Sequence, residues 1–225
     1  MNLNVRADRR ARLLLFAAAV SALILVGAAG CASGPEDEQA RTTLKQAARE
    51  DYEAGRFAES EEALQEVLAS APDDVEAMQT LALAQAAQGK NEEALETYAE
   101  IVEETPEDHA SWYRMALLER VVGSAKESAD HLKTALELNP GDPSYTDELA
   151  RTQMSLGRYE EAAALWGDLL EDADPSDESR KELFLLQGQA YQAAKDYGSA
   201  KQAFEAALEL DPDDEALRAR VDSFE

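Results

Sequence analysis

The sequence predicts an all-α protein made of stacked helical hairpins, and three observations support that prediction. Glycines and prolines recur at a constant spacing of 34 residues, at Gly55, Gly89, Gly123, Gly157 and at Pro72, Pro106, Pro140. Apolar and small residues recur at helical spacing within each repeat, and no segment shows the sustained alternation of a strand. One hairpin cannot bury its apolar face alone, so a fixed period of this kind predicts a solenoid.

The clearest repeat runs from residue 181 to 214 and contains two helical patterns joined by a short polar turn. Gly188 in the first helix and Ala200 in the second have little or no side chain, so the two backbones can approach closely there. Aromatic side chains such as Phe204 are expected to fill the space beside them. Pro212 should stop the second helix, because proline lacks the N–H and restricts the residue before it.

Period, small residues, aromatics and terminal prolines together resemble the tetratricopeptide repeat (TPR) family, whose repeat is 34 residues long. The resemblance implies a right-handed superhelical solenoid of about five helix-turn-helix repeats with a C-terminal capping helix at 215–225. The five repeats are expected at 41–74, 75–108, 109–142, 143–176 and 177–214.

The chain departs from the family pattern at a few positions. Ser60 and Ser128 stand where the family prefers alanine. The counterpart of Gly157 in the last repeat is Lys195, 38 residues later, so four extra residues lengthen the connection before the fifth repeat or the helix after it. These departures concern local packing and leave the predicted fold unchanged.

Helix starts are marked by acidic caps. Asp73 with Glu76 forms a pair typical of a capping box, and Asp142 can cap a helix whose first residue is Pro143. In the tail, Leu217, Val221 and Phe224 share one helical face and are expected to cover the apolar end of the fifth repeat.

The N-terminus has the pattern of a secretory signal peptide: a basic head, an apolar run over 13–29, and small residues before Cys31. The sequence AAGC at 28–31 resembles the lipobox of bacterial lipoproteins, which implies a signal peptide at 1–30, a lipidated Cys31 and a flexible tether at 31–40. An uncleaved membrane anchor and ordinary cleavage to a secreted protein are the alternatives. Cys31 is the only cysteine, so no intramolecular disulfide can form.

The chain is strongly acidic, with a formal net charge of −26. Nucleic acid is excluded as a natural partner because backbone binding needs clustered lysine and arginine. An acidic protein surface is repelled by the anionic lipids of a membrane. We therefore expect a lipid attached to the protein, and not a basic surface, to provide the membrane link. The acidity either keeps a repeat protein dispersed, for example in a salty medium, or attracts a basic partner.

The family resemblance implies that function lies in a concave groove lined by the first helix of each hairpin. The residues projected onto it are Lys45, Arg49, Tyr52, Gln79, Leu83, Tyr113, Leu117, Arg120, Arg151, Met154, Leu185 and Gln189. The lysine and arginines among them would make this face less acidic than the chain as a whole. The apolar residues among them would form a strip that recognises an extended peptide or amphipathic helix. Alternatively, some of these side chains are core between repeats. The family's carboxylate clamp is not expected, because Arg49 and Leu83 replace the residues it needs.

No constellation in the sequence predicts catalysis, so we expect a non-enzyme without cofactor, metal or small-molecule substrate. His109 and His131 lie in different helices with no ligand-spaced cysteine or carboxylate cluster. Trp112 and Trp166 fall on packing positions and are expected in the core.

These features predict a lipid-anchored interaction scaffold in the cell envelope that helps to assemble an envelope machine. The arrangement resembles the accessory lipoproteins of bacterial pili and of outer-membrane barrel assembly. Ala32 after Cys31 would permit sorting to the outer membrane in a two-membraned cell; in other cells the protein would stay on the outer face of the cytoplasmic membrane. The alternative is a general holdase or adaptor for exported proteins.

Overall fold

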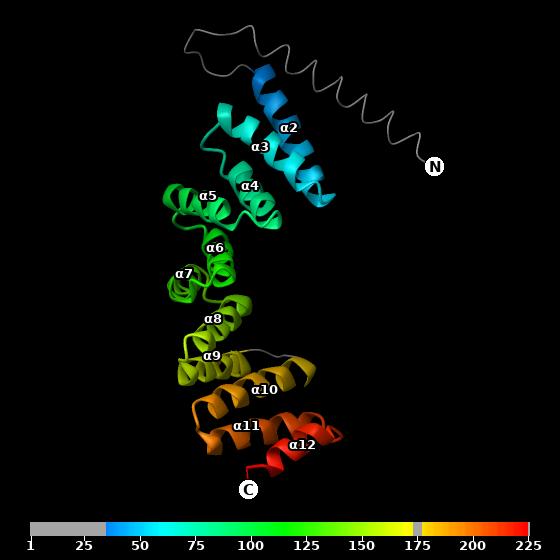
Figure 1. Ribbon diagram of the computed structural model, residues 1–225, viewed down its shortest axis with the longest axis vertical. Helices are drawn as coiled ribbons and strands as arrows, with labels where there is room; N and C mark the ends of the chain where they lie inside the picture. The colour runs from blue at the N-terminus through cyan, green and yellow to red at the C-terminus, as the bar shows by residue number, and fades with distance from the viewer. Residues whose placement is uncertain (1–34, 173–176, 225) are drawn as a thin grey trace, which may run out of the picture. The chain divides into compact units, whose positions relative to one another are not determined.

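The computed structural model describes residues 35–172 and 177–224. It divides the chain into two units, Met1–Thr42 and Thr43–Glu225, and the described part of the first is the start of one helix. Across the described ranges the secondary structure is helical, with no strand (Figure 1). The signal peptide and Cys31 lie outside the described residues.

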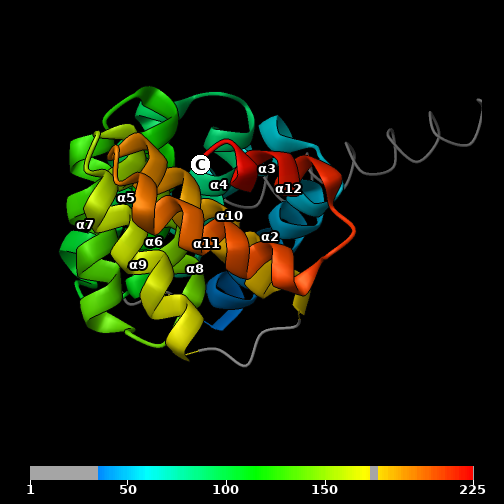
Figure 2. The same ribbon diagram turned by 90° about the horizontal axis from the view of Figure 1, so that it is seen from below.

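Ten of the helices in the described ranges form five hairpins. They are α2 (Pro35–Glu53) with α3 (Phe57–Ser70), α4 (Val75–Ala87) with α5 (Asn91–Glu104), α6 (His109–Val122) with α7 (Ala125–Leu138), α8 (Pro143–Ser155) with α9 (Tyr159–Asp172), and α10 (Asp177–Ala193) with α11 (Tyr197–Leu210). The eleventh, α12 (Glu215–Asp222), follows the last hairpin. From α3 to α12 each helix packs on the next one in the chain, so the second unit is the predicted all-α solenoid (Figures 1 and 2).

Four of the hairpin turns close on a glycine in the same way. Gly55, Gly89, Gly123 and Gly157 have φ between 73° and 91°, the left-handed region that glycine tolerates best. The following residue returns a hydrogen bond to the helix, as in Arg56 N–H to the Asp51 carbonyl at 2.8 Å. This is the Schellman arrangement, which satisfies carbonyls left free at a helix end.

Lys195 occupies this turn position in the fifth hairpin with φ of 66°, as expected from its alignment with the glycines. Its Cβ is strained there, because the left-handed conformation brings Cβ close to the next carbonyl oxygen. We therefore expect Lys195→Gly to raise the free energy of unfolding by about 1 kcal/mol. Urea denaturation measures this, with Lys201→Gly inside α11 as the control that should destabilise. A loss of stability in Lys195→Gly would contradict the turn assignment.

Aspartates cap the first helices at the same repeat position. Asp74, Asp108, Asp142 and Asp214 each accept a backbone N–H of the following turn with a side-chain oxygen. The prediction for Asp142 with Pro143 as the first helical residue is confirmed. The prediction for Asp73 is wrong by one residue: Asp74 caps α4, because its Oδ1 lies 3.0 Å from the Ala77 N–H.

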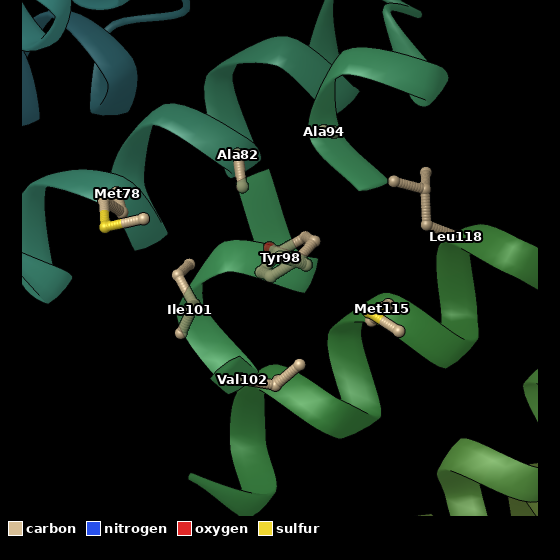
Figure 3. Packing of buried hydrophobic residues seen from close by; sticks show 8 residues of the cluster. All are labelled: Met78, Ala82, Ala94, Tyr98, Ile101, Val102, Met115 and Leu118. Atoms are coloured by element: carbon tan, nitrogen blue, oxygen red, sulfur yellow. The ribbon is translucent and has the colours of Figure 1, made fainter. Parts of the chain in front are cut away.

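Within the described residues the hydrophobic core forms five clusters between successive helices. Figure 3 shows one of them, formed by α4, α5 and α6, with Tyr98 and Ile101 fully enclosed. Burial raises the pKa of Tyr98 to about 12, so its hydroxyl is neutral near pH 7. Trp166 is 1% exposed, as predicted for a core residue. Trp112 is only half-buried, since its indole N–H reaches out to the Pro106 carbonyl at 2.9 Å.

The fifth hairpin shows the predicted close approach of backbones. A Cβ built on Gly188 would lie 2.7 Å from Phe204, whose ring is fully buried on Ala200 and Ala207. The tail covers this hairpin: Leu217 and Val221 of α12 are buried in the same cluster.

Residues 35–40 differ from the prediction of a flexible tether, since they are the first turns of α2. Pro35 can start a helix because its missing N–H has no intrahelical partner at that position. Glu36, Asp37 and Glu38 then favour the helix through its dipole. Composition alone favours a tether here, because it does not reveal the role of acidic residues at a helix start.

Two serines at the same repeat position have different surroundings. Both Ser60 and Ser128 are fully buried, but Ser128 donates to the Ala116 carbonyl at 2.8 Å, while the Ser60 hydroxyl has no partner among the described residues. A buried hydroxyl without a partner destabilises the fold by about 1–3 kcal/mol. We expect Ser60→Ala to raise the unfolding free energy by about 1 kcal/mol and Ser128→Ala to leave it unchanged or lower it. Equal shifts in the melting temperatures of the two variants would show that the Ser60 hydroxyl does have a hydrogen-bond partner.

Candidate functional site

The candidate site is the face of the first helices that carries the sequence-predicted residues, here called the first-helix face. It comprises Lys45 and Arg49 of α2, Gln79 and Leu83 of α4, Tyr113, Leu117 and Arg120 of α6, Arg151 and Met154 of α8, and Leu185 of α10, together with half-buried Tyr52 of α2 and exposed Gln189 of α10. Positions four residues apart share one side of a helix, which is why these side chains fall on common faces. Most are half-buried, while Arg49, Arg120 and Arg151 are exposed.

The N-terminal cations of this face are held by the next repeat. Lys45 Nζ lies 3.1 Å from Asp74 and 2.7 Å from Glu76, and Arg49 lies 3.8 Å from Glu76. A hydrogen bond to Glu76 and another to Asp74 raise the pKa of Lys45 against the effect of desolvation. Arg49 also pairs with Glu53 at 3.5 Å. Lys45 therefore couples α2 to the capped start of α4.

The two arginines further along are engaged in the same way. Arg120 of α6 pairs with Glu148 of α8, whose side chain is 12% exposed. Arg151 pairs with Asp147 at 2.8 Å and lies 3.9 Å from Glu182 of α10. The bond to Asp147 raises the pKa of the Arg151 guanidinium. The four predicted cations thus meet six carboxylates, and this ion network keeps a net negative charge.

Gln79 acts as an inter-repeat contact. Its Nε2 lies 2.6 Å from Asp108 Oδ2, and the same carboxylate accepts from the Ser111 hydroxyl at 2.6 Å. Burial opposes ionisation of Asp108, but the bonds from Ser111, Gln79 and the Ala110 N–H outweigh it and lower the pKa of the carboxyl. The arrangement joins α4 to the N-terminus of α6.

Tyr113 forms an aromatic contact between α6 and α8. Its ring stacks on Tyr145 with centroids 4.5 Å apart, and the Tyr145 hydroxyl lies 2.8 Å from His109 Nδ1. Burial raises the pKa of both tyrosines, and nearby carboxylates such as Glu148 and Asp142 add to the shift. The alternative that some predicted residues are inter-repeat core applies to Tyr113.

The apolar residues of the face fall into two groups. Met154 and Leu185 are half-buried and pack against core clusters. Leu83 and Leu117 are half-buried and lie outside the five clusters of the described chain. Val121, one turn after Leu117, is 66% exposed, the highest value among the large apolar side chains that are exposed in the described ranges. Val121 was not among the residues predicted from the sequence, although its spacing of four from Leu117 was a usable signal.

The histidines have structural partners. His131 Nδ1 lies 2.8 Å from Glu119 Oε2, and its ring lies 5.1 Å from the Trp112 ring centroid. Within residues 35–172 and 177–224 no group of three or more His, Cys, Asp or Glu side chains is placed to hold a metal ion. None of the helices in these ranges is long and apolar enough to cross a membrane. A shallow hollow of about 270 Å³ lies beside α5, lined by Pro72, Asp73, Met78, Glu100, Glu103 and Glu104.

Comparisons with solved structures show the same fold. A tetratricopeptide repeat protein from Parabacteroides merdae aligns with a TM-score of 0.70 and 19% identity, covering 83% of this chain and 73% of its own. The crystal structure of MamA protein aligns with a TM-score of 0.69 and 18% identity, covering 76% and 92%. A thermophilic TPR protein of Thermus thermophilus aligns with a TM-score of 0.50 and 22% identity, covering 82% and 98%.

Sequence comparison with curated proteins finds no match. Tetratricopeptide repeat models match residues 45–109, 113–178 and 182–214, which is most of the chain. The repeats support a protein-interaction scaffold. The repeated turns and helix caps lie within the matched residues, and the chain belongs to the tetratricopeptide repeat family.

Proposed function

We propose that this protein is a lipid-anchored interaction scaffold, displayed outside the cytoplasmic membrane, that assists assembly of an envelope machine. The observation that carries the proposal is the place of Cys31, the sole cysteine, directly after the apolar run and the small residues at 28–30. A solenoid of interaction repeats then follows within a few residues. Such an arrangement would hold a bound partner close to the membrane.

The structure is consistent with binding as the mode of action. The first-helix face presents half-exposed Leu83 and Leu117 and exposed Val121, bordered by ion pairs. Exposed apolar side chains with a polar border are typical of protein-recognition surfaces. The ion pairs bridge adjacent repeats and support the helices that carry those side chains.

The lipid anchor can be tested by labelling the full-length chain with an alkyne fatty acid in a bacterial host. We expect label on the tryptic peptide that starts at Cys31 and ends at Arg41, together with recovery in the membrane fraction. Cys31→Ser should lose the label. The double variant Cys31→Ser with Ser33→Cys is the matched control, since it keeps one cysteine but moves it out of the lipobox-like position, and it should also lack label.

Two outcomes would contradict the anchor. Membrane recovery of an unmodified chain that keeps residues 1–30 would indicate an uncleaved membrane anchor. A processed, unlabelled chain in the soluble fraction would indicate ordinary secretion. Either result would leave the interaction role of the repeats intact but remove the lipid from it.

A further inference from the structure

The first-helix face offers little free positive charge to a partner. All four cations predicted for it are paired with carboxylates of the same chain, and those carboxylates outnumber them. Arg120 is bound to a largely buried Glu148, so using it for a ligand would leave that carboxylate uncompensated. An acidic segment or a C-terminal carboxylate is therefore a poor match for this face.

The apolar part of the face lies on α4 and α6. Contacts of Gln79 Nε2 with Asp108 Oδ2 and Ser111 Oγ join the two helices at one end. Leu83 lies one turn beyond Gln79, and Leu117 occupies the same repeat position in α6, followed one turn later by the exposed Val121. We call Leu83, Leu117 and Val121 the apolar patch.

We propose that the apolar patch docks the apolar side of a lysine- or arginine-rich amphipathic segment of a partner protein. This inference rests on the proposed scaffold function and specifies the chemistry of its partner. Charge complementarity selects the occupant: the ion pairs of the first-helix face contain six carboxylates for four cations, and the whole chain carries −26. Such a field accelerates the approach of a cationic segment, and the apolar contact then holds it in place.

The test uses the mature protein and three synthetic peptides of about five helical turns. One has leucines along a single side and lysines elsewhere, a second has the same residues scrambled so that no apolar side forms, and a third replaces the lysines with glutamates. We expect the first to bind at least about tenfold more tightly than either of the others, measured by fluorescence anisotropy at constant salt.

Paired variants locate the binding site. Val121→Ser removes an exposed side chain of the patch and should weaken the lysine peptide about tenfold. Leu138→Ser removes a 40% exposed side chain at the end of α7 and should leave binding unchanged. Both positions are exposed, and thermal melting confirms that each variant is folded.

Three results would overturn the inference: equal effects of the two variants, equal binding of the scrambled peptide, or tighter binding of the glutamate peptide. The first two would show attraction by charge alone, without the patch. An in-cell partner captured on this face through an acidic segment would also refute it while leaving the scaffold function standing. If Cys31 carries no lipid, the proposed membrane location is wrong, but the result of the peptide-binding experiment is unaffected.

Discussion

Ala200→Glu is expected to unfold the fifth hairpin, with a loss of more than about 4 kcal/mol in that region. Ala200 is fully buried in the cluster formed by Phe204, Ala207 and the capping helix. The backbones approach closely in this hairpin, since even a Cβ on Gly188 would collide with the Phe204 ring. A carboxylate at position 200 would have no room in this apolar cluster.

Circular dichroism during heating measures this effect. In a repeat array each unit depends mainly on its neighbours, so the variant should lose the α10–α12 signal in an earlier, separate transition. Gln202→Glu adds the same charge at an exposed position of the same helix and should melt like the wild type. A single unchanged transition in Ala200→Glu would contradict the repeat register.

The second large effect is expected for Asp108→Ala. This side chain caps α6 through the Ala110 and Ser111 N–H groups and also binds the Ser111 hydroxyl and Gln79 of the preceding repeat. We expect a loss of about 2–3 kcal/mol, because both a helix cap and an inter-repeat contact disappear. Asp142→Ala is the matched control: Asp142 accepts from the Ser144 N–H in an exposed cap, so about 1 kcal/mol should be lost.

The effect of Asp108 should depend on pH in a defined direction. Its pKa is lowered in the folded state, so the ionised carboxylate stabilises the fold above the unfolded pKa of about 4, and that contribution is lost as the pH falls through the folded value. Urea denaturation at pH 7 and at pH 3 should therefore show a smaller difference between Asp108→Ala and the wild type at pH 3. A larger difference in acid would contradict the network.

The fold could be predicted from the sequence because a repeat displays the same physical requirement several times. The turn position was visible in four glycines at constant spacing, and the alignment of Lys195 with them agrees with the structure, where all five residues have positive φ. The close approach at Gly188 followed from small residues facing an aromatic. Cap positions were less certain, since Asp73 and Asp74 are adjacent carboxylates and only the backbone decides which one accepts the N–H.

The ion pairing and the side-chain exposure of the candidate site could not be predicted in the same way. Several partners of its cations lie about one repeat away, as with Lys45 and Asp74 or Arg120 and Glu148, and such pairs depend on how the helices pack. Only the pairs of Arg49 with Glu53 and of Arg151 with Asp147 are four residues apart in one helix and could be read from the spacing. The sequence therefore suggested a face less acidic than the rest of the chain, where the structure pairs each of these cations with carboxylates. The exposure of Val121 likewise depends on which side of α6 the neighbouring helices cover.

The central claim is that the first-helix face holds a protein partner at the membrane. In-cell photo-crosslinking from Val121 and Leu117, with Leu138 as the control position, tests it most directly. We predict one dominant adduct from the first two positions, in the membrane fraction, and none from Leu138. Adducts from Leu138 alone would show that another surface binds the partner, and a smear of many exported proteins at every position would indicate a general holdase.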